Sequence, residues 1–79
     1  TEQTLDLSNN ILSDLKNKTF KGLSNLIAIK LNNNKINIIE NETFNYFRKV
    51  KKVELNFNYL NKVNERLFVY LNELEYLNL

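Results

Sequence analysis

Three charged residues spaced 24 apart, Asp6, Lys30 and Glu54, come nearest in this sequence to a catalytic arrangement. Two carboxylates held together can divide the roles of general acid and general base. A lysine stands between them in the same series, so we predict a salt-bridge relay instead of an acid–base pair. The chain has no histidine and no cysteine, and its one glycine, Gly22, cannot form a glycine-rich phosphate loop. We therefore predict no enzyme activity, no catalytic residue, no cofactor and no metal site.

The spacing of these charges belongs to a repeat of 24 residues that runs through the whole chain. Apolar residues recur at fixed positions, as do asparagine and phenylalanine, and only Glu2 departs from the pattern. One copy cannot bury its own apolar face, so neighbouring copies must stack and share a core. The sequence therefore predicts a solenoid in which residues 1–79 form a single segment of about three and a third repeats.

Each repeat divides into a short strand and a longer return limb. Alternation of apolar and polar residues predicts four strands, which fixed register makes parallel. Their predicted centres are Leu5–Leu7, Ile29–Leu31, Val53–Leu55 and Leu77–Leu79. The apolar residues of the limb have spacings that fit neither a strand nor a long helix, so we expect irregular backbone with short 3₁₀ turns. Phe20, Phe44 and Phe68 should form one buried column on the return side.

Asparagine occupies one fixed position of every copy, at Asn10, Asn34 and Asn58. The chain must leave the strand there, and an inward amide can bond backbone groups that no sheet or helix satisfies. We therefore predict a buried asparagine ladder with a structural role. Asparagine is abundant elsewhere too, with 16 copies, and it can replace glycine in turns because it tolerates the left-handed backbone region.

The repeat L-x-x-L-x-L-x-x-N-x-L-x-x-L-x-x-x-x-F-x-x-L-x-x resembles the leucine-rich repeat along the whole chain. Its length and its phenylalanine are similar to the subtype found mostly in extracellular proteins, such as Toll-type receptor ectodomains and insect leucine-rich immune proteins. The resemblance implies a curved parallel sheet on a concave face, with return limbs on the convex side. It also implies an extracellular protein that binds a protein ligand or co-receptor along the concave face, in innate immunity or as a receptor. A structural or adhesive module of the matrix or cell surface is the alternative.

Charge and chain ends limit the prediction further. The net charge of +2 argues against a nucleic-acid partner, and no apolar run is long enough to span a membrane. The chain begins just before a strand and stops inside another, whereas solenoids need polar terminal caps. We therefore expect an internal part of a longer solenoid.

The outward side chains of the strands are the candidate binding surface. Phe57 stands where the other copies have Asn9 and Asn33, and exposed aromatic residues on a rigid sheet are common interface anchors. The alternative is that Phe57 folds over the rim of its own core. The candidate partner-binding residues are Lys30, Lys52, Glu54, Asn56, Phe57 and Tyr76.

Two further patterns suggest contact with carbohydrate. The basic cluster at residues 48–52 is a hypothetical site for an anionic glycan, although such runs are often solvated turns. Two sequons for N-glycosylation, beginning at Asn17 and Asn41, lie at equivalent positions of successive limbs. With this much asparagine, about one or two sequons arise by chance, so they support an extracellular location only weakly.

Overall fold

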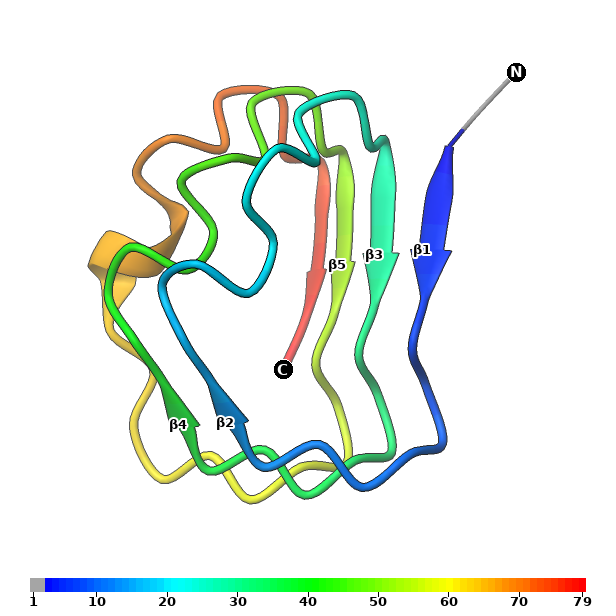
Figure 1. The fold of residues 1–79 in the computed structure, drawn as a ribbon, viewed down its shortest axis with the longest axis vertical. Helices are drawn as coiled ribbons and strands as arrows, with labels where there is room; N and C mark the ends of the chain where they lie inside the picture. Colours follow the sequence, from blue (N-terminus) through cyan, green and yellow to red (C-terminus); the bar gives the residue numbers. More distant parts are fainter. Residues whose placement is uncertain (1–2) are drawn as a thin grey trace.

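The computed structural model describes residues 3–79, so Glu2, the one departure from the repeat, lies outside the described part. Figure 1 shows the chain winding through successive coils, with strands on one side and return limbs on the other. Four strands form one parallel sheet in the order β1-β3-β5-β6. They are β1 (Thr4–Asp6), β3 (Ala28–Lys30), β5 (Lys52–Glu54) and β6 (Tyr76–Asn78).

The register of this sheet follows the 24-residue repeat. Leu5 pairs with Ile29, Ile29 with Val53, and Val53 with Leu77. The predicted parallel pairing is therefore confirmed, but each strand begins and ends one residue earlier than predicted. The ladder continues past the strand ends, because Leu7 N–H donates to Lys30 O at 2.9 Å. The curvature of the sheet stays a prediction.

The return limbs contain the expected 3₁₀ structure and one feature that the sequence did not predict. The third limb has a 3₁₀ helix, η1 (Glu65–Phe68), which Asn64 caps by accepting a hydrogen bond from the Arg66 N–H. The unpredicted feature is a second parallel pair, β2 (Asp14–Leu15) and β4 (Ile38–Ile39), visible at the lower left of Figure 1. Strands of two residues are too short to show a period in the sequence.

A single core lies between the sheet and the limbs. Phe20 and Phe44 are fully buried and Phe68 is partly buried, with successive ring centroids 6.3 and 6.0 Å apart. The predicted phenylalanine column is therefore present. Phe47 joins it from a neighbouring repeat position, 5.2 Å from Phe20 and 5.5 Å from Phe44. The other fully buried apolar side chains are Leu15, Ile29, Leu31, Ile36, Val50, Val53 and Leu55.

Asn34 joins two repeats through its side-chain amide. Its Nδ2 donates to the carbonyls of Leu7 at 3.0 Å and Leu31 at 3.1 Å, and its Oδ1 accepts from the Leu12 N–H at 3.1 Å. Leu7 and Leu12 belong to the preceding repeat, so the amide satisfies backbone groups on both sides of the interface. With only 6% of its surface exposed, Asn34 has the predicted ladder role.

The other two asparagines of the ladder differ in burial. Asn58 repeats the pattern, bonding Leu31 O at 2.9 Å and accepting from the Ile36 N–H at 3.0 Å, but it is half-buried. Asn10 is exposed and bonds only the carbonyls of its own turn. The prediction that Asn10 is buried is therefore wrong, because burial here comes from bridging to a preceding repeat.

Asn34→Ala is expected to lower the free energy of unfolding by roughly 1–3 kcal/mol, because it strands backbone groups of two repeats. Asn37→Ala is the matched control, since Asn37 is exposed and should change stability by no more than about 0.5 kcal/mol. Denaturant titration of both variants makes the comparison. Equal effects would contradict the ladder.

Candidate protein-binding surface

The outer face of the four-stranded sheet carries a mixed set of half-buried and exposed side chains. Side chains alternate along a strand, so Leu5, Ile29 and Val53 point to the core and their neighbours point outward. Lys30, Lys52 and Glu54 are half-buried there. Tyr76 on β6 is more exposed, and the Lys52 ammonium lies 5.2 Å from the centroid of its ring. A cation held over an aromatic ring gives this part of the face a defined shape.

Asp6 is hydrogen-bonded chiefly to Ser8, whereas the sequence predicted that its main partner would be Lys30 in a salt-bridge relay. The Asp6 carboxylate accepts hydrogen bonds from the Ser8 hydroxyl at 2.5 Å and the Ser8 N–H at 3.0 Å. These bonds lower the pKa of Asp6, and the charge of Lys30 adds a smaller effect in the same direction. Asp6 is therefore held within its own turn, and its interaction with Lys30 is secondary.

Ser8→Ala is expected to raise the pKa of Asp6 toward its ordinary value of 3.8, because the hydroxyl that donates the hydrogen bond to the carboxylate is removed. Because the pKa of Asp6 is lowered in the folded state, the ionised carboxylate stabilises the folded protein at pH values above the ordinary pKa. This stabilisation is lost as the pH falls through the folded-state pKa. The variant should therefore show a smaller loss of stability below pH 3.8. NMR titration of the Asp6 carboxyl measures the shift, and an unchanged pKa would contradict the assignment to Ser8.

Asn32 and Asn56 follow β3 and β5 at the position that Ser8 occupies after β1. Their side-chain oxygens are buried, and within residues 3–79 neither has a hydrogen-bond partner. An unsatisfied buried polar atom costs about 1–3 kcal/mol. Asn56 was predicted as a binding residue and Asn32 was not. The same side-chain oxygen is therefore buried without a protein hydrogen-bond partner in two successive repeats.

Phe57 is held in the left-handed backbone region, with φ of 60°. Asn9 and Asn33, the residues at the same position in the preceding repeats, have φ of 58°. Asparagine tolerates this conformation, whereas a bulky side chain there costs on the order of 1–2 kcal/mol. The sequence predicted that Phe57 would be exposed but not that its backbone would be strained, although the two asparagines were the available signal.

The Phe57 side chain is 75% exposed. It also lines a hollow of about 310 Å³ with Leu55, Leu60, Val63 and other residues at the rim of the core. This position at the rim supports the alternative that Phe57 covers part of its own core. The large exposed fraction favours the view that most of the ring is available to another molecule.

The stability of a Phe57→Asn variant should show which effect of Phe57 is larger, the cost of its strained backbone or the stabilisation from packing its ring on the core. If the strain dominates, the variant gains about 1 kcal/mol of stability, because asparagine suits the left-handed backbone and little burial is lost. The reciprocal change Asn33→Phe should lose a similar amount. Thermal melts of both variants provide the measurement, and a clear destabilisation by Phe57→Asn would identify the ring as part of the core.

The basic cluster at residues 48–52 is divided between two surroundings. The Arg48 guanidinium lies 4.8 Å from the centroid of the Tyr70 ring, and its Nε donates to Asn45 O at 3.2 Å. Lys52 lies instead over Tyr76 in the sheet. Lys49 and Lys51 are exposed. Two cations of the cluster are therefore engaged with rings in different parts of the repeat, and the anionic-glycan site stays a prediction.

A family model described as leucine rich repeat matches residues 3–60. The chain belongs to the leucine-rich repeat family. The repeats of this family generally mediate protein–protein interaction and are typically non-catalytic. Among curated proteins, nothing matches the chain. The matched residues include β1, β3 and β5, and β6 continues their register beyond the match.

The leucine-rich repeat segment contains little that suggests another kind of site. Within the described residues there is no group of three side chains among Asp, Glu, His and Cys that would hold a metal ion. The same part of the chain has no helix of the length and hydropathy needed to cross a membrane. Asn17 and Asn41 are exposed on the return limbs, away from the sheet.

Proposed function

We propose that this leucine-rich repeat protein binds a protein partner through the outer face of its four-stranded sheet. The surface comprises strand residues Lys30, Lys52, Glu54 and Tyr76 together with Asn56 and Phe57, which follow β5. We call this surface the sheet face. Phe57 carries the proposal, because an aromatic side chain is held exposed on strained backbone. Strained residues persist where the surrounding structure holds them, and they gather at binding sites.

The neighbouring side chains suit a specific interface. Tyr76 is also exposed, and the half-buried charges of Lys30, Lys52 and Glu54 are already positioned by the sheet. Aromatic anchors supply most of the affinity in such surfaces, whereas charges at the rim contribute to the association rate and to specificity. The mixture of signs favours a partner that is itself mixed in charge over a polyanion.

We further propose that the protein acts outside the cell, in innate-immune or receptor-type recognition. The support is the 24-residue repeat with its phenylalanine and the exposure of both sequon asparagines, Asn17 and Asn41. A structural or adhesive role in the matrix is the competing function. In that case partners would contact surfaces other than the sheet face.

Photo-cross-linking tests which surface meets the partner. A photoreactive phenylalanine analogue at position 57 should capture a discrete protein from extracellular fluid of the source organism. The same group at position 18, on an exposed part of the first limb, is the matched control and should capture nothing comparable. Capture from position 18 alone would assign recognition to the limbs and overturn the sheet-face proposal.

Affinities for the captured partner then test the individual residues. Phe57→Ala should weaken binding by about 2 kcal/mol, whereas Lys30→Glu should act mainly on the association rate and its salt dependence. Glu42→Ala, on the second limb, should leave the affinity unchanged. If Phe57→Ala destabilises the repeat but the protein that remains folded binds the partner with unchanged affinity, Phe57 is structural and the proposal fails.

A further inference from the structure

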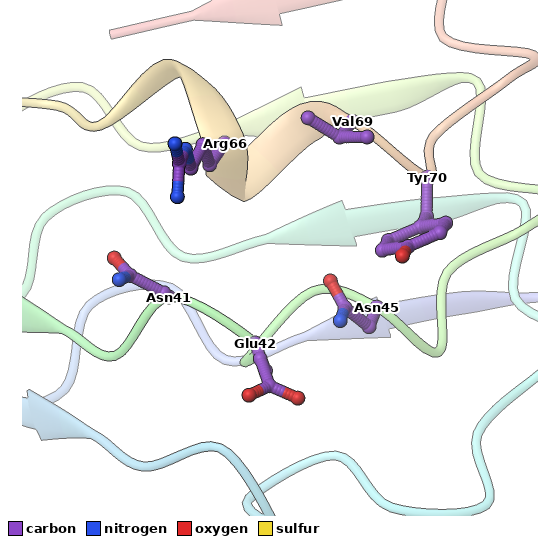
Figure 2. A pocket seen from close by; sticks show the side chains of 6 residues that line it. All are labelled: Asn41, Glu42, Asn45, Arg66, Val69 and Tyr70. Carbon is purple, nitrogen blue, oxygen red and sulfur yellow. The ribbon is translucent and has the colours of Figure 1, made fainter.

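The return limbs carry two neighbouring hollows that the proposed function does not use. One, of about 420 Å³, is lined by Asn41, Asn45, Arg66, Val69 and Tyr70 together with Glu42 (Figure 2). The other, of about 390 Å³, is lined by Asn17, Lys18, Tyr46 and Arg48 together with Glu42 and Asn45. Each hollow thus contains one sequon asparagine and one tyrosine from the following limb, at the same spacing. The two are repeat-related copies of one arrangement.

In the folded limb, the Asn41 side chain is held through its oxygen, which leaves its amide nitrogen free to carry a substituent. Its Oδ1 accepts a hydrogen bond from Asn64 Nδ2 at 2.9 Å. Within residues 3–79, Asn41 Nδ2 donates no recorded hydrogen bond. An N-linked sugar is attached through this nitrogen, so the bond from Asn64 can remain after modification. The asparagine is therefore held in place by the atom that the reaction leaves unchanged.

The third residue of this sequon, Thr43, is buried. Its hydroxyl donates to Leu15 O at 3.3 Å, so Thr43 also stabilises the fold. A transferase must therefore read the sequon before the limb folds. In the transfer, Asn41 Nδ2 forms a bond to the anomeric carbon of an oligosaccharide diphospholipid. The bond from that carbon to the diphosphate oxygen breaks, and the released diphosphate leaves with its electron pair while Nδ2 loses a proton.

Tyr70 presents an uncovered apolar surface beside Asn41. Its ring is 43% exposed, and Val69 beside it is 60% exposed. The Arg48 guanidinium lies over the ring, 4.8 Å from its centroid, and Tyr70 also lines the hollow. Figure 2 shows the Asn41 and Asn45 amides on the side of the second limb that faces Arg66 and Tyr70, whereas the Glu42 carboxylate turns away. The hollow thus offers a ring for the C–H face of a sugar and polar groups for its hydroxyls.

We propose that Asn17 and Asn41 are N-glycosylated and that the first N-acetylglucosamine of each glycan occupies its hollow, against Tyr46 and Tyr70 respectively. Covalent attachment at the edge of the hollow gives this sugar a high effective concentration there, which a free ligand lacks. Each sugar joins two adjacent limbs. Glycans on the limbs leave the sheet face as the uncovered protein surface. The inference rests on the extracellular location in the proposed function.

The test begins with the protein secreted from a eukaryotic host, in which intact mass should show both sequons occupied. Trimming each glycan to its first sugar should preserve the melting temperature, because that sugar makes the contact. Asn41→Gln should lower the melting temperature by roughly 4 °C, the shift expected from losing one modest contact in a domain of this size. The same change in unglycosylated bacterial protein gives the baseline for losing the bond from Asn64.

Tyr70 provides the decisive comparison, because Tyr46 also packs on the core whereas Tyr70 does not. In a Tyr70→Ala background, Asn41→Gln should shift the melting temperature no more than it does in the bacterial protein. Tyr59→Ala is the matched control, since Tyr59 is 62% exposed and lines neither hollow. Unoccupied sequons in the secreted protein, or an equal Asn41→Gln effect with and without Tyr70, would overturn the inference. Partner capture at position 57 is independent of both outcomes, so the two proposals fail separately.

Discussion

Satisfaction of backbone polar groups across the boundary between repeats is the constraint on which the structure depends. The strands of the main sheet are three residues long and the limbs contain little regular structure, so backbone donors and acceptors remain that no strand or helix pairs. Asn34 and Asn58 supply missing partners, each bonding one carbonyl and one N–H of the repeat before it. The phenylalanine column fills the space that this bonding encloses. The 24-residue period is fixed because the asparagine hydrogen bonds and the phenylalanine contacts must both form at every boundary between repeats.

The sequence predicted those features that depend on side chains recurring in register. Parallel strands, the inward asparagines and the phenylalanine column all follow from one period and from the need to stack. It did not predict the β2–β4 pair, because two residues such as Asp14 and Leu15 are too few to show the alternation of apolar and polar residues that marks a strand. It also misjudged Asn10, since burial depends on a neighbouring repeat as well as on residue type.

The candidate site was predicted less completely, for a different physical reason. Exposure of Phe57 could be inferred from its place after a strand, but its left-handed backbone appears only in three dimensions. The asparagines at positions 9 and 33 indicated that conformation indirectly. Thr43 shows the opposite case, because one residue belongs both to a sequon and to the core. Sequence patterns cannot separate two such roles when both require the same side chain.

The bridging asparagines also give each repeat boundary its own spectroscopic marker. The Leu12 amide proton is held by Asn34, and the Ile36 amide proton by Asn58. Neither amide can exchange its proton with water until the side chain of the next repeat withdraws. The two exchange rates therefore report separately on the opening of successive boundaries. After correction for the intrinsic exchange rate of each amide, boundaries that open independently would give two different opening free energies, whereas boundaries that open cooperatively would give the same opening free energy at both amides.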